Sequence, residues 1–564
     1  MKKLLILAVA SLLLYACSSK PPVEEKQDNS KTEQDAAQAA PVATVDELLS
    51  KETGLVTTVQ GQRKGIEYQA CGAMQIRGCR APGFDDFNTE EYSHITENGF
   101  LAVTDHPLST FSIDVDAASY SNVRRFITES QQPPVDAVRI EELINYFTYD
   151  YPQPTGDHPF SVITEISDCP WNTNNRLLHI GLQGKSFESE ELPASNLVFL
   201  LDVSGSMNSP DKLGLVKKAF RMLTDNLREQ DRVAIVVYAG AAGLVLPSTS
   251  GDNKQEILAA IEKLHAGGST AGGAGIRLAY EVASKNLIKG GNNRVILATD
   301  GDFNVGISNT SDMVRLMEEK RELGISITVL GFGMGNLKDS RMEQMADNGN
   351  GNYYYIDNEK EAKKVFVNEM GSTLFTIAKD VKIQIEFNPV RVASYRLIGY
   401  ENRLLNDEDF NDDKKDAGEI GAGHTVTALY EIVPAGGETG QASIDPLKYQ
   451  TTGITNTAVD SDELLTLKLR YKQPDGDVSR LISVPVIDEH LAINKTSNNF
   501  RFSAAVAEFG MLLRGSEFSG DATFADVIDL AGGARGRDKF EYRSEFIDLV
   551  KRCKDMGFEV AQKN

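Results

Sequence analysis

Oxygen-bearing side chains follow an apolar stretch near residue 200 and could bind a hard cation. Residues 197–201 are all apolar, and the next five residues, D-V-S-G-S, place Asp202, Ser204 and Ser206 at alternate positions. A carboxylate at the end of a buried strand costs several kcal/mol unless a positive group meets it. Because Mg²⁺ prefers oxygen ligands, these three side chains predict a site for a divalent cation.

Two later stretches offer further ligands of the same kind. Thr270 supplies a hydroxyl at the end of the glycine-rich stretch 267–270, and Asp300 follows the largely apolar stretch 294–299 and precedes Gly301. The composition of residues 294–299 predicts a second buried strand. We therefore expect both strands to end in a carboxylate beside a hydroxyl-bearing loop.

The order D-x-S-x-S, then a threonine, then a strand-terminal Asp-Gly resembles the metal-ion-dependent adhesion site (MIDAS) of von Willebrand factor type A (VWA) domains. The resemblance implies that Ser204 and Ser206 bind Mg²⁺ (or Mn²⁺ or Ca²⁺) directly, and that Thr270 binds it directly or through water. It also implies that Asp202 and Asp300 hold the cation mainly through waters, with one position left for a partner's carboxylate. The alternative is that the serines only cap the following helix, which explains neither Thr270 nor Asp300.

The elements that must position these residues alternate between helix and strand. Apolar stretches and amphipathic stretches follow one another from residue 193 to residue 375, which is typical of a doubly wound α/β sheet. The resemblance implies that the first and fourth strands are neighbours where the winding reverses. Open α/β sheets bind ligands at that point, beyond the carboxyl ends of the strands, so the fold and the motif predict the same site.

Alternating apolar and polar residues on both sides of this region predict half-exposed strands. We expect these strands to form a β-sandwich into which the Rossmann-like VWA domain is inserted, with a small α/β module before it and helices after it. Across residues 98–554 the chain resembles a bacterial VWA lipoprotein family with N-terminal and C-terminal accessory modules. Near the start of that region, Asp114 and Asp116 are spaced like metal ligands, but we favour the interpretation that they cap a helix over residues 117–128.

The predicted boundaries are as follows: 1–16, signal peptide; 17–95, lipidated tether and poorly structured segment; 96–155, N-terminal accessory module; 156–192, first part of the β-sandwich; 193–375, VWA domain; 376–495, second part of the β-sandwich; 496–564, C-terminal helical segment.

The N-terminal residues predict export. Lys2 and Lys3 precede an apolar run over residues 4–14, and the tetrapeptide L-Y-A-C at 14–17 resembles a bacterial lipobox. The resemblance implies that Cys17 is lipidated, and the serines that follow it imply sorting to an outer membrane, on its periplasmic or surface face. Cleavage elsewhere, without lipid, is the alternative. We therefore expect a protein of the bacterial cell envelope that is held on the membrane by lipid.

Four further cysteines, Cys71, Cys79, Cys169 and Cys553, form an even count that favours disulfides in an exported protein. Cys71 with Cys79 would close a short loop, and Cys169 with Cys553 would join distant segments. Free buried thiols are the alternative.

Charge and motifs exclude several classes of function. The formal net charge of −23 leaves no basic surplus for nucleic acid. The chain contains no H-E-x-x-H motif and no phosphate-binding loop with its lysine, so we expect no enzyme. We expect a binding protein whose partner is a protein that presents an Asp or Glu carboxylate. A metal-dependent hydrolase and an assembly scaffold whose MIDAS is closed by an acidic residue of its own chain are the alternatives.

Overall fold

Six strands form the sheet that carries the predicted cation site. The computed structural model describes residues 89–269, 272–301, 310–437 and 453–558. The sheet has the order β10-β9-β8-β5-β6-β7, and β7 is the antiparallel edge strand. Its strands are β5 (Ser195–Asp202), β6 (Arg232–Tyr238), β7 (Ala242–Ser250), β8 (Asn292–Thr299), β9 (Ile325–Phe332) and β10 (Tyr353–Ile356). The first and fourth strands, β5 and β8, are parallel neighbours, as the resemblance implied.

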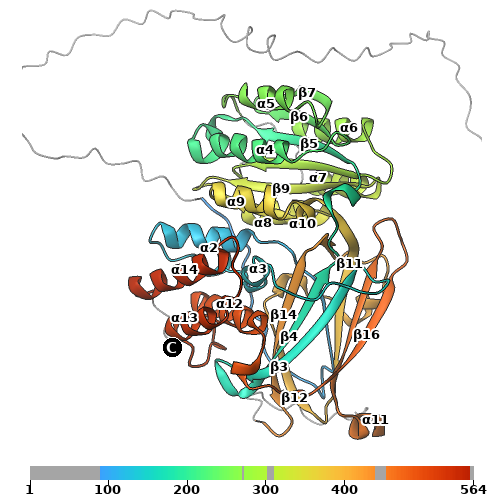
Figure 1. Cartoon of the computed structure of the whole chain (residues 1–564), viewed down its shortest axis with the longest axis vertical. Coiled ribbons are helices and arrows are strands. Elements are labelled where there is room, and N and C mark those ends of the chain that lie inside the picture. Colours follow the sequence, from blue (N-terminus) through green and yellow to red (C-terminus); the bar gives the residue numbers. More distant parts are fainter. Residues whose placement is uncertain (1–88, 270–271, 302–309, 438–452, 559–564) are drawn as a thin grey trace, which may run out of the picture. The chain divides into compact units, whose positions relative to one another are not determined.

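Helices cover both faces of this sheet (Figure 1). They are α4 (Leu215–Asp225), α5 (Lys254–Glu262), α6 (Gly272–Lys285), α7 (Thr310–Glu322), α8 (Asp339–Asn348), α9 (Glu359–Lys363) and α10 (Met370–Leu374). Side chains of β5 alternate between two cores, so that Phe199 packs in the core that contains Phe220, and Leu200 packs in the core that contains Ile276. This alternation on a fully buried strand is the packing that a doubly wound sheet requires.

Two further sheets form a β-sandwich around one apolar core. One has the order β1-β12-β14-β4-β3, and the other has the order β13-β11-β15-β16 with β2 paired to β11. The strands are β1 (Leu101–Ala102), β2 (Leu108–Ser112), β3 (Phe160–Cys169), β4 (Asn172–Gly184), β11 (Thr376–Phe387), β12 (Val392–Ile398), β13 (Gly418–Gly421), β14 (Thr425–Pro434), β15 (Glu463–Lys472) and β16 (Arg480–Ile487). Because β4 pairs with β14 across the VWA domain, the prediction of an inserted domain is confirmed.

The stretch 96–155 contributes both strands and helices to the fold. Its strands belong to the sandwich, since β1 pairs with β12 and β2 pairs with β11. Its helices α2 (Ala118–Thr128) and α3 (Ile140–Asn145) pack with C-terminal helices (Figure 1). The remaining helices are α11 (Asn456–Asp460), α12 (Asn498–Arg514), α13 (Phe524–Gly533) and α14 (Tyr542–Met556). A two-residue strand such as β1 leaves no periodic signal in the sequence.

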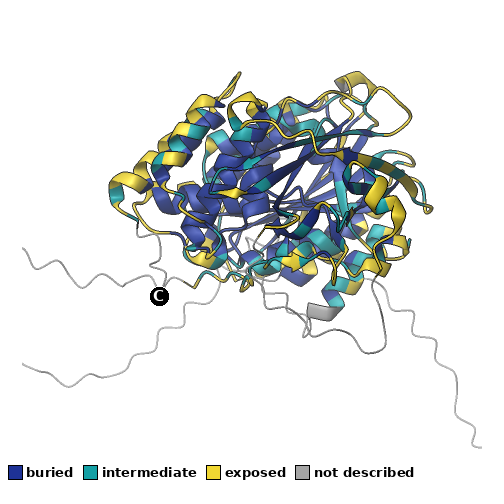
Figure 2. Ribbon diagram, turned by 90° about the horizontal axis from the view of Figure 1, so that it is seen from below, coloured by how far each residue is buried: buried dark blue, intermediate teal, exposed yellow. Residues whose placement is uncertain are grey.

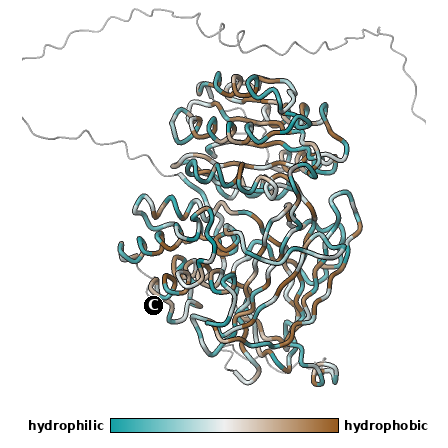
Figure 3. Tube along the Cα trace, in the orientation of Figure 1, coloured by the Kyte–Doolittle hydropathy of each residue, from teal (hydrophilic) through white to brown (hydrophobic). Residues whose placement is uncertain are grey.

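Burial follows the same division of layers. The strands are largely buried, and exposed residues gather on the outer faces of helices and in loops (Figure 2). Hydrophobic residues lie along the strands and inner helix faces (Figure 3). Helix α12 is buried on all sides, which explains its weak amphipathic pattern. Among the residues that the structure describes, no helix is long and apolar enough to cross a bilayer.

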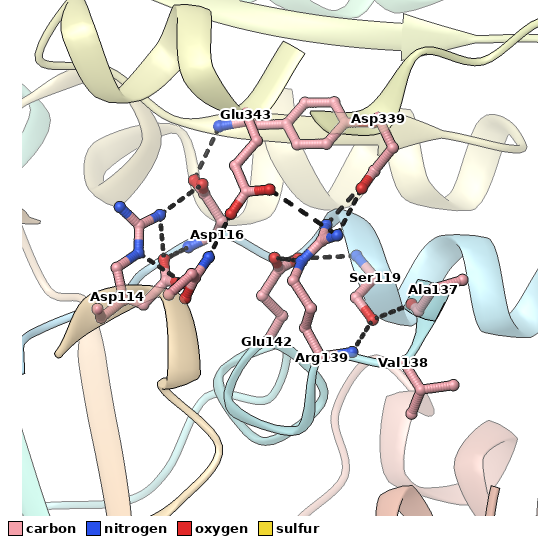
Figure 4. A network of polar contacts seen from close by, with 12 residues as sticks. Asp114, Asp116, Ser119, Ala137, Val138, Arg139, Glu142, Asp339 and Glu343 are labelled. Carbon is pink, nitrogen blue, oxygen red and sulfur yellow. Dashed lines mark hydrogen bonds and ion pairs between the residues drawn. The ribbon is translucent and has the colours of Figure 1, made fainter. Parts of the chain in front are cut away.

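Buried charges join helix α8 of the VWA domain to α3 (Figure 4). The guanidinium of Arg139 contacts Glu142 of α3 and Asp339 of α8, and all three side chains are at most 5% exposed. Glu343, also on α8, lies 4.0 Å from the same guanidinium. The VWA domain is thus held to the rest of the molecule by ion pairs that water does not reach.

Asp114 and Asp116 do not cap helix α2, so that prediction is wrong. The helix has no side-chain cap, and both carboxylates instead face Arg403. Asp116 also accepts a hydrogen bond of 2.8 Å from the backbone nitrogen of Tyr353 on β10. The two aspartates therefore form ion pairs with Arg403, and Asp116 also contacts the VWA domain. A short carboxylate side chain suits a helix cap and a buried ion pair equally well, so the sequence did not distinguish the two.

The predicted bridge between Cys169 and Cys553 is absent. Both thiols are free and buried; Cys169 ends β3 and Cys553 lies in the C-terminal helix α14. Cys17, Cys71 and Cys79 lie outside the described residues, so the lipidation and the short disulfide stay predictions.

We expect Cys169 and Cys553 to resist alkylation in the native protein. Burial raises the pKa of the Cys553 thiol to about 12 and raises that of Cys169 as well, and only the thiolate is nucleophilic. Iodoacetamide at pH 8 should modify them only after unfolding in urea, as measured by mass spectrometry of tryptic peptides. Modification of either residue at the same rate with and without urea would contradict the buried positions.

Candidate cation site

Asp202 and Asp300 meet at one edge of the six-stranded sheet. Asp202 is the last residue of β5 and Asp300 follows β8, and the two strands are parallel neighbours. Both side chains are buried, with exposures of 0% and 2%. Burial raises the pKa of Asp202, hydrogen bonds from Ser204 oppose the rise, and the negative charge of Asp300 adds to it. Two buried carboxylates repel each other, so a positive charge beside them would stabilise their ionised forms.

The serine loop presents its hydroxyls beside Asp202. The backbone nitrogen of Ser204 donates to Oδ1 of Asp202 over 2.8 Å, and the hydroxyls of Ser204 and Ser206 lie 3.0 Å apart. Ser204 precedes a short 3₁₀ turn but makes no side-chain cap in it, and helix α4 begins only at Leu215. The alternative that Ser204 caps a helix is therefore not supported.

The glycine-rich loop is hydrogen-bonded directly to the serine loop. The backbone nitrogen of Gly205 donates to the carbonyl of Gly268 over 3.1 Å, and that of Gly267 donates to the carbonyl of Val203 over 2.8 Å. Gly268 has φ +81°, and a Cβ there would lie 3.3 Å from the nitrogen of Gly240, so glycine suits this close approach. Thr270 itself lies outside the described residues, and its role stays a prediction.

Lys212 is the residue that sequence reasoning missed. Its Nζ lies 2.9 Å from Oδ2 of Asp300, in a pair whose side chains are 14% and 0% exposed. The carbon chain of Lys212 lies against Gly333, where a Cβ would overlap it. Lys212 lies in a π-helical turn, Pro210–Gly214, and a lysine six residues after D-x-S-x-S gives no sequence signal for this contact. In the structure, a cation of the chain itself meets the charge of Asp300.

The oxygen set fits a hard divalent cation in its chemistry. Buried Asp202 and Asp300 supply charge, and Ser204 and Ser206 supply neutral oxygens, which is the mixture that Mg²⁺ accepts together with water. Among the described residues, no three His, Cys, Asp or Glu side chains are grouped so as to hold a metal ion. Binding here would therefore depend on the hydroxyls.

Comparisons with known proteins identify the family. Three family models match the chain: "von Willebrand factor" over residues 86–179, "von Willebrand factor type A domain" over 196–368, and "Uncharacterized protein YfbK, C-terminal" over 372–556. The chain is 42% identical to "Uncharacterized protein YfbK" of Escherichia coli (strain K12), over 98% of both chains. The chain belongs to the YfbK family. It is thus a bacterial VWA protein with a C-terminal module.

Other similar proteins match in part. "Uncharacterized protein sll0103" of Synechocystis sp. (strain ATCC 27184 / PCC 6803 / Kazusa) is 31% identical over 34% of this chain and 45% of its own length. A solved structure titled "von Willebrand factor type A from Catenulispora acidiphila" is 15% identical, with a TM-score of 0.38, over 70% of this chain and 91% of that one. The "ArnB paralog VWA2 from Sulfolobus acidocaldarius" is 14% identical, with a TM-score of 0.34, over 71% and 98%.

Membership in this family supports a coarse functional statement. The VWA domain points to protein–protein interaction, and VWA proteins are generally interaction modules without catalytic activity. VWA domains commonly bind a divalent metal at the MIDAS. The YfbK relative is itself uncharacterised by name.

Proposed function

We propose that this protein is a lipid-anchored, cation-dependent binding protein of the bacterial envelope. Ser204, Ser206 and Thr270 would hold Mg²⁺, Mn²⁺ or Ca²⁺, and Asp202 and Asp300 would hold it through waters. The remaining coordination position would take an Asp or Glu carboxylate of a protein partner. The observation that carries the proposal is the convergence of Asp202 and Asp300 beside the paired serine hydroxyls.

The charge of the chain supports a role for the cation in partner capture. At a net charge of −23, the protein repels an acidic ligand at long range. A divalent cation at the edge of the sheet would provide local attraction for such a ligand. A lipid on Cys17 would hold the domain at the outer membrane, to which the serines after Cys17 imply sorting. Residues 18 to about 50 would separate the domain from the membrane.

The experiment measures cation binding and partner capture separately. Calorimetry with Mg²⁺ or Mn²⁺ alone tests the site, and pull-down from envelope extract with Mg²⁺ or with EDTA tests capture. We expect binding of either cation, and loss of one or more captured proteins in EDTA. Capture that is complete in EDTA would defeat the cation bridge, and absence of cation binding would defeat the site itself.

We expect Lys212→Met to tighten Mg²⁺ or Mn²⁺ binding by roughly tenfold. A cation at this site must compete with the ammonium of Lys212 for Asp300, and a hydrogen bond to a charged group contributes roughly 1.5–3 kcal/mol. Calorimetric titration of the variant measures the change. The matched control is Lys217→Met, because Lys217 bonds only to the exposed carbonyl of Glu262.

An unchanged or weaker affinity in Lys212→Met would show that the ammonium does not compete with the cation. The same contact bears on the alternative of an internally closed scaffold site. That alternative needs an acidic residue of the chain at the cation, whereas Lys212, which contacts Asp300, is basic. We therefore favour capture of a partner over permanent internal closure.

A further inference from the structure

A cleft of about 910 Å³ lies beside the candidate cation site. Its walls come from α2, from the turns after β9 and β10, and from α14, which lies alongside α2 in Figure 1. Asp211, next to Lys212, and Gly333, which packs on the chain of Lys212, both line it. This volume falls within the range of sites that hold ligands in proteins.

The cations inside the cleft are already neutralised. Arg124 contacts three carboxylates, those of Asp357, Glu361 and Glu545. Arg125 is paired with Glu90 over 2.7 Å, and Lys360 contacts Glu545 as well. An acidic ligand would therefore find little unpaired positive charge in the interior of the cleft.

The rim of the cleft carries excess negative charge. Glu129, Asp211, Glu541 and Asp548 are exposed rim residues, and Arg552 is the exposed base among the lining residues. Asp548 lies 3.0 Å from Lys551. For the other three carboxylates, the described part of the chain provides no ion pair. Such a rim favours a basic occupant.

The described chain begins at this rim. The backbone nitrogen of Thr89 donates to the carbonyl of Gly335 over 2.9 Å, and Glu90 accepts a 2.9 Å bond from the nitrogen of Gly335. Met334, the preceding residue, lines the cleft. Thr89, the first described residue, therefore lies at the edge of the cleft.

A basic stretch, residues 61–83, ends shortly before this point, and residues 84–88 between them contain Asp85 and Asp86. Residues 61–83 contain one acidic residue, Glu67, and four basic residues: Arg63, Lys64, Arg77 and Arg80. They also contain apolar side chains that a cleft can cover. From Gly83 to Thr89 the chain can span up to about 20 Å. A short connection of this kind gives an effective concentration on the order of millimolar.

We propose that residues 61–83 of the same chain dock in this cleft, with their basic side chains against the acidic rim. The docked segment would lie beside Asp211 and Lys212, and therefore beside the candidate cation site. A partner that uses the cleft would have to displace it. The proposal does not depend on cation binding, since it rests on the cleft, its charge and the position of Thr89.

Limited trypsin digestion of the full chain in detergent tests the proposal, because the docked segment holds four cleavage sites. The rim variant combines Glu129→Gln, Asp211→Asn, Glu541→Gln and Asp548→Asn. We expect cleavage after Arg63, Lys64, Arg77 and Arg80 to become about tenfold faster, since several surface ion pairs are lost and proteolysis follows the undocked population. The control variant neutralises exposed acids elsewhere: Asp252→Asn, Glu256→Gln, Asp475→Asn and Asp477→Asn.

Hydrogen exchange of α14 provides the second measurement. A tail variant with Arg63, Lys64, Arg77 and Arg80 each replaced by Gln should expose the cleft and raise the exchange of residues 541–552 severalfold. Equal cleavage rates in the wild type and the rim variant would overturn the proposal. Unchanged exchange in the tail variant would also overturn it, and would leave the acidic rim to a basic segment of another protein.

Discussion

Replacing Asp202 by Asn is expected to weaken Mg²⁺ or Mn²⁺ binding by about 100-fold while the fold survives. Groups that orient a metal through a second layer of contacts typically contribute 10–100-fold to affinity, and this substitution also removes one of two buried negative charges. The amide keeps the size of the side chain and can still accept the hydrogen bond from the nitrogen of Ser204. Because burial disfavours the charged form of Asp202, we expect no loss of stability in the absence of metal.

Calorimetry with either cation measures the affinity, and thermal unfolding followed by circular dichroism checks the fold. The matched control is Asp225→Asn, which makes the same charge change at the exposed end of α4. Equal affinity in Asp202→Asn and Asp225→Asn would show that Asp202 does not help to hold the cation. A folded variant without cation binding would support the site regardless of which protein is the partner.

The sequence was sufficient for those parts of the structure that depend on local patterns. Residues 197–201 are apolar on both strand faces because β5 is covered by helices on both sides. The alternation in β4 and β14 was expected to leave one face exposed, but both faces are largely buried, because one faces the core of the sandwich and helix α3 packs against β14 on the other. The pairing of β4 with β14 encloses the inserted domain. The two strand-terminal carboxylates could be placed together because parallel neighbours end at the same edge.

The parts that could not be predicted depend on contacts between distant residues. Lys212 lies in a helical turn, Pro210–Gly214, directly before α4, and its side chain passes over Gly333 to reach Asp300. The even number of cysteines favoured a disulfide between Cys169 and Cys553, yet each is buried as a free thiol. The cleft needs α2 and α14, which are more than 400 residues apart in the sequence. Composition and local patterns carry no information about contacts between residues that are distant in the sequence.

Arg139 is where the largest loss of stability is expected. Arg139→Met should destabilise the native protein by roughly 3–5 kcal/mol at pH 8, since removal of one partner leaves buried charges without compensation. Three carboxylates face this guanidinium, from Glu142 at 0% exposure, Asp339 at 0% and Glu343 at 9%. Methionine fills much of the space but supplies no charge.

The loss should shrink as the pH falls, because these carboxyl groups can take up protons. Burial raises the pKa of Glu142 and of Glu343 to about 7, although Arg139 lowers both. Without Arg139 the two pKa values rise further, while the unfolded values stay near 4.5. Between these values the native state binds more protons than the unfolded state, so acidification stabilises the native state of the variant.

Urea unfolding at pH 8 and at pH 5.5 therefore separates charge from packing. We expect the difference between Arg139→Met and the wild type to be smaller at pH 5.5 than at pH 8. The control is Arg221→Met, which breaks an exposed pair with Glu262 and should cost less than about 1 kcal/mol at either pH. An equal cost for Arg139→Met at both pH values would assign its effect to lost packing. It would then follow that the ion pairs between α3 and α8 are not what holds the VWA domain in place.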